Sequence, residues 1–272
     1  MPLMAEWISD ADDPRIAVYR DVRERDLVGR SGLFVAEGQV VLRALLESRT
    51  AEPVSILVAE SRLSALSGLL ETAGDGIQVF VASQAVMDRI VGFPIHRGIL
   101  ALGRKPGPGD LASILGKADE GALVLALSGI SNHDNMGGLF RNAAAFGVDA
   151  VALDSDCCDP FYRKALRVSV GGVLKTPHVR IGPDADLVGS LQAQGLRVLA
   201  LSPAGERPLA SIQGGGRLAV LLGSEGAGLS PEVLARCETV RIPMAAGFDS
   251  LNVATTSGIV LHHLRSGSTD AG

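Results

Sequence analysis

The chain has 272 residues and 47% of them are hydrophobic, which suits one large domain or two ordinary ones. It contains 33 glycines but only 4% aromatic residues, a mixture typical of an α/β protein with many tight strand-to-helix turns. The formal net charge is −5, and neither side of residue 110 is net positive, which excludes a protein that binds nucleic acid through a basic surface overall.

The first part of the chain predicts a small α/β domain. Asp12-Asp13-Pro14 is expected to start a helix, because carboxylates cap helices and proline is favoured in the first turn. Short hydrophobic runs predict strands at 33–36, 54–58, 77–81 and 99–102, and the segments between them predict helices at about 38–48 and 62–72. Arg104–Asp110 alternates proline and glycine and predicts a linker.

The second part of the chain predicts a larger parallel sheet. Strands are expected at 123–128, 148–153, 196–201, 218–222 and 239–242, and helices at about 136–146, 160–170, 184–194 and 252–264. Several of these strands are continuous apolar runs, which is typical of strands buried on both faces.

Polar or glycine-rich segments follow four of these strands, at 128–138, 202–205, 223–230 and 243–252. Ligands of open parallel sheets bind beyond the carboxyl ends of the strands, so the four segments predict one common site. Neither the G-x-x-x-x-G-K-[ST] nor the G-x-G-x-x-G phosphate-binding pattern is present, and Gly214–Gly216 precedes a strand instead of following one. A cofactor without phosphate groups, such as S-adenosylmethionine, fits this pattern.

Three motifs lie on the predicted strand ends, in the order 132–148, 221–230 and 242–253. The first contains Asn135-Met136-Gly137 with Arg141 one turn further on. The second reads Leu-Leu-Gly-Ser-Glu-Gly-Ala-Gly-Leu-Ser, and the third joins Ile242-Pro243-Met244 to Ser-Leu-Asn-Val. Together they resemble the SpoU family of RNA 2′-O-ribose methyltransferases, within the SPOUT superfamily. Residues 30–103 resemble the ribosomal-protein-L30e-like domain that often precedes it.

The resemblance implies an α/β fold whose C-terminal parallel-sheet SPOUT domain contains a trefoil knot. It divides the chain into an N-terminal L30e-like domain that binds the RNA substrate (1–105), a linker (106–116), the methyltransferase domain (117–265) and a disordered tail (266–272). It also implies S-adenosyl-L-methionine as cofactor, RNA as substrate and a homodimer with each active site near the subunit interface. The two-domain layout favours rRNA slightly over tRNA, and no DNA or membrane partner is expected.

The same resemblance assigns the residues of the site. The catalytic residues are expected to be Asn135, Arg141, Glu225, Ser250 and Asn252. The cofactor is expected to contact Ser202, Gly205, Leu222, Gly223, Ile242, Met244 and Leu251. No metal site is expected, because no metal-ligand spacing emerges.

Several of these residues have a structural alternative. Asn135 is also suited to cap a helix that begins near Met136, and Ser250 and Asn252 are suited to form the start of the last helix. The family often takes Arg141 as the base for the 2′-OH proton. However, a guanidinium has a pKa above 12, so we expect Arg141 instead to clamp an RNA phosphate.

RNA contacts are expected from local basic clusters. One cluster near the start comprises Arg15, Arg20, Arg23, Arg25 and Arg30, and acidic residues interleaved with it also fit a solvated helix face. The other, here called the basic trio, comprises Arg163, Lys164 and Arg167 on one predicted helix face. His133 is a further candidate for RNA contact, whereas His96, His178, His262 and His263 are expected to be structural or on the surface.

Two other interpretations stay open from the sequence. One is a catalytically inactive RNA-binding factor of the same fold. The other is a protein or small-molecule substrate, to which the charge of −5 points. A cytoplasmic protein is expected in each case, since the sequence has no basic region followed by an apolar core near its start and its three cysteines form no disulfide framework.

Overall fold

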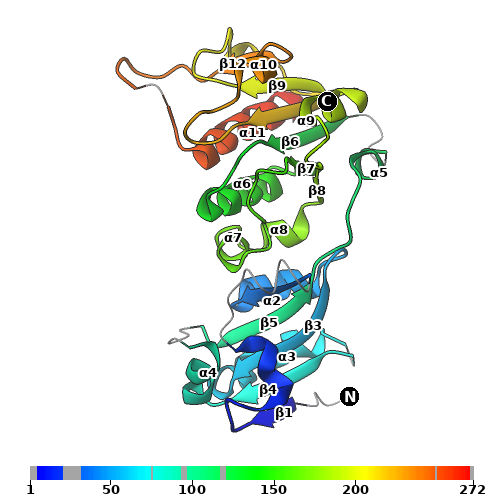
Figure 1. The fold of residues 1–272 in the computed structure, drawn as a ribbon, viewed down its shortest axis with the longest axis vertical. Coiled ribbons are helices and arrows are strands. Elements are labelled where there is room, and N and C mark those ends of the chain that lie inside the picture. Colours follow the sequence, from blue (N-terminus) through cyan, green and yellow to red (C-terminus); the bar gives the residue numbers. More distant parts are fainter. Residues whose placement is uncertain are drawn as a thin grey trace. The chain divides into compact units, whose positions relative to one another are not determined.

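The computed structural model describes residues 5–20, 32–74, 76–92, 97–116, 121–248 and 250–269. The chain forms two compact units (Figure 1). The first comprises Met1–Pro106 together with Phe161–Leu174, and the second comprises Gly107–Pro160 together with Lys175–Gly272. A segment from the second half of the sequence therefore packs with the first unit.

The first unit has a mixed sheet with the strand order β1-β4-β3-β5-β2. Its strands are β1 (Ala5–Ile8), β2 (Leu33–Glu37), β3 (Glu52–Ala59), β4 (Gln78–Ala82) and β5 (Ile99–Arg104). Strands β1, β4 and β3 pair in parallel, while β5 is antiparallel to both β3 and β2. The helices are α2 (Gln39–Leu46), α3 (Glu60–Glu71) and α4 (Gln84–Val91). The four predicted strands and two predicted helices are confirmed, whereas β1 and α4 were not predicted.

The start of the first unit is held to its sheet by a short helix. Pro14–Tyr19 forms a 3₁₀ helix capped by Asp13, whose carboxylate accepts a hydrogen bond from the Arg15 amide, so the predicted helix start is confirmed. The buried Tyr19 hydroxyl lies 2.7 Å from Ser55 Oγ. Of the predicted cluster of arginines near the start, Arg23, Arg25 and Arg30 lie outside the described residues, as does His96.

Residues 161–174 pack against β2 within the first unit. The ring of Phe161 lies 4.9 Å from that of Phe34, and α7 (Arg163–Val168) follows it. Arg163 and Arg167 lie 3.7 and 3.8 Å from the carboxylate of Glu37, which is buried. Two members of the basic trio therefore have an acidic partner at the end of β2.

The second unit is built on a parallel sheet with the order β10-β12-β9-β11-β6-β7-β8. Its strands are β6 (Ala122–Leu127), β7 (Ala150–Leu153), β8 (His178–Arg180), β9 (Arg197–Leu201), β10 (Arg207–Pro208), β11 (Arg217–Leu222) and β12 (Glu238–Arg241). Its helices are α5 (Leu111–Leu115), α6 (His133–Ala145), α9 (Leu187–Ala193), α10 (Pro231–Leu234) and α11 (Val253–Thr269). The short α8 (Gly172–Lys175) belongs to the first unit except for its last residue. The predicted parallel sheet, buried on both faces, is confirmed.

Alternate residues of the strands face opposite sides of this sheet. Ala219 and Leu221 of β11 belong to a core cluster with Leu115 of α5 and Leu191 of α9. Leu222 points to the other face, where it lines a cavity with residues from the start of α11. Helices α6 and α11 lie side by side in this unit (Figure 1).

The structure differs from the prediction at both ends of the second unit. The stretch predicted as linker, 106–116, contains α5, which is capped by Asp110 and buries Leu111 and Leu115. Helix α11 continues to Thr269, beyond the predicted start of the tail at 266, while residues 270–272 lie outside the described part. Within the described residues, no helix has the length and apolar character required to cross a membrane.

Candidate active site

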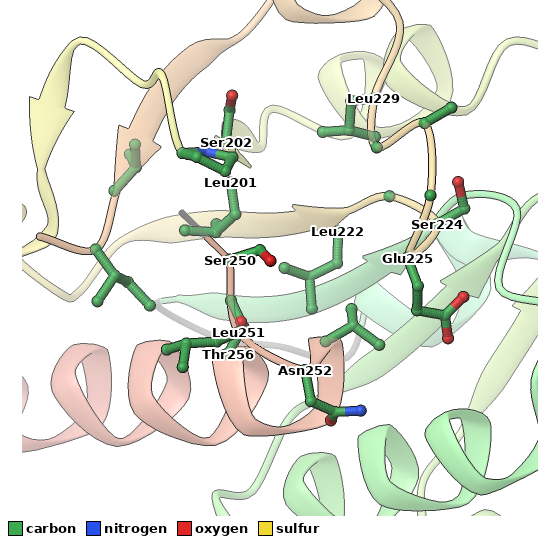
Figure 2. Close-up of a pocket in the computed structure, with 18 of the residues that line it drawn as sticks. Leu201, Ser202, Leu222, Ser224, Glu225, Leu229, Ser250, Leu251, Asn252 and Thr256 are labelled. Carbon is green, nitrogen blue, oxygen red and sulfur yellow. The ribbon is translucent and has the colours of Figure 1, made fainter. Parts of the chain in front are cut away.

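A cavity of about 570 Å³ opens at the carboxyl ends of β9, β11 and β12 (Figure 2). Three of the predicted polar segments line it. The lining residues are Leu201, Ser202, Pro203, Leu222, Gly223, Ser224, Glu225, Gly226, Ala227, Gly228, Leu229, Val240, Ile242, Met244, Ser250, Leu251, Asn252, Val253 and Thr256. The sheet therefore brings together segments that are separated by up to 55 residues in the sequence, from Leu201 to Thr256.

Backbone packed tightly at two glycines shapes this cavity. A Cβ on Gly223 would lie 2.5 Å from the carbonyl carbon of Gly228, so the loop after β11 folds back on itself only because residue 223 has no side chain. A Cβ on Gly205 would lie 2.5 Å from the carbonyl carbon of Val240. Gly205 is not in the cavity lining, but its contact with β12 holds the turn that carries Ser202 and Pro203.

Apolar side chains and one charged side chain face this cavity. Leu201, Leu222 and Leu251 provide apolar wall, and Figure 2 shows their side chains around the opening. Among the described residues of the lining, Glu225 is the charged one and none is basic. A ligand with a cationic group and no phosphate suits these walls, because a phosphate would meet a carboxylate without a balancing cation.

Asn252 begins the last helix at the edge of the cavity. Its Oδ1 accepts hydrogen bonds from the backbone N–H groups of Ala254 at 2.9 Å and Thr255 at 3.2 Å, which caps α11. Its Nδ2 donates to Oδ1 of Asn135 at 2.8 Å. Asn135 in turn donates from Nδ2 to Oε1 of Glu225. Three elements distant in sequence thus meet in one chain of side-chain hydrogen bonds, here called the amide chain.

Asn135 lies inside helix α6 and does not cap it, which differs from one interpretation of the sequence. Helix α6 is capped by Asn132, whose Oδ1 accepts from the amides of Asp134 at 2.8 Å and Asn135 at 3.3 Å. The helix therefore begins at His133, before the predicted start near Met136. The prediction that Asn135 caps this helix was wrong. The Asn135 side chain is left to join the amide chain, because Asn132 already satisfies the first amides of the helix.

Close packing of α6 and α11 keeps the amide chain together. A Cβ on Gly138 would lie 2.7 Å from the Cβ of Ala254, so these helices approach each other as closely as a glycine allows. One turn later, Asn142 Nδ2 donates to the carbonyl oxygen of Ala254 at 2.6 Å and to Ser257 Oγ at 2.8 Å. Both contacts hold the start of α11 against the middle and the last turn of α6.

Arg141 lies apart from this arrangement. It is exposed on α6, is not in the cavity lining, and makes no hydrogen bond or ion pair with the part of the chain that the structure describes. Its guanidinium is thus available to a partner from solution.

The loops that follow β6 and β7 are held by residues that the sequence analysis missed. The Asp154 carboxylate, after β7, accepts hydrogen bonds from the amides of Gly129 at 3.0 and 3.1 Å and Cys157 at 3.0 Å. Arg180 donates to the carbonyl oxygens of Asp154 at 2.8 Å and Cys158 at 3.1 Å. An aspartate directly after a predicted strand was the available signal for this support.

The cysteines beside these loops are free and poorly suited to nucleophilic chemistry. Burial raises the pKa of the Cys157 thiol to about 12, and the charge of Asp154 adds to the effect. Burial also raises the pKa of the Cys158 thiol to about 11. Both thiols therefore stay protonated near neutral pH.

Most of the predicted site residues meet at the cavity. Of the predicted cofactor-binding residues, the structure places six in the lining, namely Ser202, Leu222, Gly223, Ile242, Met244 and Leu251, while Gly205 lies behind it. Of the predicted catalytic residues, Glu225, Ser250 and Asn252 line the cavity, Asn135 is joined to two of them, and Arg141 stands apart. Thr256, one turn into α11, was not predicted because no motif residue marks it.

Comparisons of this chain with a family model and with known proteins all point to RNA methyltransferases. The model of the SpoU rRNA Methylase family matches residues 122–262. A tRNA/rRNA methyltransferase described as uncharacterized, from Mycobacterium tuberculosis, is 38% identical over 266 residues, which cover 94% of this chain and 90% of the relative. The 23S rRNA (guanosine-2′-O-)-methyltransferase RlmB of Acinetobacter baylyi is 31% identical over 205 residues, covering 72% and 82%.

A solved structure has the same fold. The crystal structure of an AdoMet-bound rRNA methyltransferase from Sinorhizobium meliloti superposes with a TM-score of 0.78 at 24% identity, and covers 96% of this chain and 98% of the other. The similarity therefore extends over both compact units.

Proposed function

The chain belongs to the SpoU rRNA methylase family, and from that premise we propose that it transfers a methyl group from S-adenosylmethionine to a ribose 2′-oxygen of RNA. The observation that carries the proposal is the cavity at the ends of β9, β11 and β12, which is lined by leucines, by uncharged polar side chains and, among the described residues, by one carboxylate. The relative from Acinetobacter baylyi is named a guanosine-2′-O-methyltransferase of 23S rRNA, which supports the ribose oxygen as acceptor.

The residues of the cavity fit S-adenosylmethionine, which supplies an electrophilic methyl group when bound. Leu201, Leu222 and Leu251 offer apolar surface to an adenosine, and the backbone of the tight turn at Gly223 lines the same cavity. The lining has no basic side chain among the described residues, so nothing there favours the phosphates of a nucleotide.

We assign the RNA contacts to residues outside the cavity. Arg141 is exposed on α6, outside the cavity lining, and would clamp a phosphate of the substrate, which orients the reacting ribose. The first unit would hold the RNA as an L30e-like substrate-binding domain. The substrate is proposed to be rRNA in preference to tRNA, the protein to act in the cytoplasm as a homodimer, and the C-terminal domain to contain a trefoil knot.

Incubation of the purified protein with radiolabelled S-adenosylmethionine and separate pools of rRNA, tRNA and protein tests the proposal. We expect label in RNA, and nuclease digestion should show it on ribose. Label in protein alone would support the alternative drawn from the acidic charge. RNA binding without transfer to any pool would support the inactive RNA-binding factor.

Calorimetry tests the cofactor independently. S-adenosylhomocysteine should bind, while ATP and NAD should not. Tight binding of ATP or NAD without any response to S-adenosylhomocysteine would contradict the assignment of the cavity.

A further inference from the structure

Three strands of the first unit end at the same edge of its sheet. Strands β2, β3 and β4 run in the same direction, because β3 pairs in parallel with β4 and β5 is antiparallel to both β2 and β3. Strand β5 therefore begins where the other three end. The amide of Gly38 donates to the carbonyl oxygen of Ile99 at 3.0 Å, and the amide of Ala59 donates to that of Gly98 at 2.8 Å. Residues 37–38, 59–62 and 97–99 thus meet in one area, here called the carboxyl edge.

Two arginines at the carboxyl edge lie against glycines. A Cβ on Gly38, which has φ +86°, would lie 2.9 Å from Cδ and 3.0 Å from Nη1 of Arg97. A Cβ on Gly98, which has φ +61°, would lie 3.4 Å from Cγ of Arg62 in the first turn of α3. Each arginine therefore packs against backbone that carries no side chain. Because Gly38 follows β2 and Gly98 precedes β5, the two arginines lie over neighbouring strand ends.

These two arginines have no anionic partner in the protein. Arg62 and Arg97 are exposed and make no hydrogen bond or ion pair with the part of the chain that the structure describes. The first two turns of the helices that begin at the carboxyl edge contain the acidic residues Glu60 and Asp88, and neither forms an ion pair with them. In a chain with 30 acidic residues and 25 lysines and arginines, carboxylates are in excess. Two neighbouring guanidiniums without a carboxylate therefore point to an anionic ligand from outside the chain.

A second pair of arginines adds positive charge at the same place. Arg163 and Arg167 of α7 share the one carboxylate of Glu37, the last residue of β2, at 3.7 and 3.8 Å. One negative charge balances only one of the two guanidiniums, so this group keeps a net positive charge next to Gly38. The four arginines come from α3, α7 and the start of β5, and no single stretch of sequence contains them, which is why no cluster was predicted here.

We propose, on the basis of the function proposed above, that the carboxyl edge binds the phosphodiester backbone of the RNA substrate and that Arg62 and Arg97 each bind a phosphate. A guanidinium offers N–H donors in a planar fork that matches two phosphate oxygens. The group around Glu37 attracts the same strand and adds about one contact or less. Phosphate contacts of this kind fix the position of a nucleic acid without reading its bases, so the carboxyl edge holds RNA and leaves the choice of nucleotide to the second unit.

The double variant Arg62→Ala/Arg97→Ala tests this site. Its affinity for a fluorescently labelled oligouridine RNA of about 20 nucleotides is measured by anisotropy between about 50 and 200 mM KCl. Each phosphate contact with a single strand contributes about 0.7 to the salt slope, so the loss of two contacts should lower the slope by about 1.4. The same relation gives a loss of affinity of about 25-fold near 0.1 M salt. Arg97→Lys keeps the charge without the fork, and should keep the slope while it loses part of the affinity.

Arg49→Ala/Arg89→Ala is the matched control. Both arginines are exposed, and neither has a partner among the described residues. Arg49 follows the end of α2 and Arg89 lies in the last turn of α4, whereas both helices begin at the carboxyl edge. The control changes the net charge by the same amount and should leave the salt slope unaltered. Equal losses in the two double variants would show an effect of net charge alone and would overturn the site.

Methyl transfer and cofactor binding separate the site from the reaction. Arg62→Ala/Arg97→Ala should raise KM for rRNA at least about tenfold and change kcat less, as expected for a residue pair that holds the substrate away from the reacting atoms. Calorimetry with S-adenosylhomocysteine should give an unchanged affinity, which checks folding without use of activity.

The remaining outcomes are distinct from one another. An unchanged salt slope in Arg62→Ala/Arg97→Ala overturns the site, as does failure of the unaltered protein to bind the oligouridine RNA at about 50 mM salt. Binding of inorganic phosphate that the double variant loses, without any change in RNA affinity, would show a site for a free anion and would also overturn the proposal. If RNA binds as expected but no RNA pool accepts a methyl group, the proposed function fails and the RNA site stands.

Discussion

Gly138→Ala tests whether close packing of α6 and α11 determines the geometry of the site. The added methyl group would lie 2.7 Å from the Cβ of Ala254, whereas two carbon atoms pack best at about 3.5–4.0 Å. The helices must therefore separate by about 1 Å at this point. Asn135 lies one turn before Gly138, and Asn252 lies two residues before Ala254, so the 2.8 Å hydrogen bond between these amides should be stretched or lost.

The effects on stability and on activity should differ in size. Overpacking costs about 1–3 kcal/mol, but replacing a glycine inside a helix by alanine returns about 0.8–1 kcal/mol, so the net loss in the free energy of unfolding is about 0–2 kcal/mol. A displacement of 1 Å in a catalytic arrangement can cost about 10²-fold in rate. The variant should therefore remain folded and lose most of its activity.

Urea unfolding and single-turnover methyl transfer measure these two quantities. Ala254→Gly removes the opposing methyl group, so the double variant should regain much of the lost rate. Gly68→Ala in α3 is the control, because nothing lies within 4 Å of its added Cβ, and it should leave activity unchanged. Full activity of Gly138→Ala, or a double variant no better than the single one, would refute the argument.

Three further predictions concern charge. Arg141→Ala should abolish methyl transfer while S-adenosylhomocysteine affinity, measured by calorimetry, stays within a few-fold; full activity would remove Arg141 from the mechanism. Glu238→Gln should lower the free energy of unfolding by up to about 1 kcal/mol at pH 7. The hydrogen bond from Arg197 lowers the pKa of Glu238, so this contribution should disappear as the pH falls below about 4 in urea titrations, and a constant difference would contradict it. RNA affinity should depend on salt with a slope equal to roughly two to four phosphate contacts. Alanine at all three positions of the basic trio should lower that slope by about one contact or less, because Glu37 pairs with Arg163 and Arg167; a larger drop would show that Glu37 does not neutralise these two arginines.

Much of the fold follows from patterns that the sequence displays locally. Long apolar strands such as 122–127 and 217–222 are typical of the interior of a parallel sheet. Their ends were predicted to within one or two residues. Strands β8 and β10 have three and two residues, too few for any periodicity to mark them. Helix α5 was hidden by the prolines and glycines before it, although Asp110 and the Leu111/Leu115 spacing were signals for a capped helix.

Contacts between distant segments could not be predicted in this way. No local pattern indicates that 161–174 packs against β2, because that contact depends on the tertiary fold. The motifs indicated which residues belong to the site, but the amide chain joins side chains 90 and 117 residues apart, and only the structure shows its direction. The trefoil knot and the homodimer stay predictions from the family resemblance, since general rules of chain connection argue against a knot.

The distribution of charge indicates how an acidic chain can act on RNA. Arg15 pairs with Glu6 and Asp13, and Arg20 pairs with Asp12, so the described members of the first cluster are already neutralised. Arg163 and Arg167 of the basic trio have Glu37 as a partner. Arg141, by contrast, is exposed on α6 and has no ionic partner among the described residues. Because unpaired cations attract phosphates most strongly, we expect Arg141 to contribute more to RNA binding than the arginines that already have a carboxylate partner. A net charge of −5 then weakens the binding of RNA elsewhere on the protein and leaves the contact at the site to decide which ribose is presented.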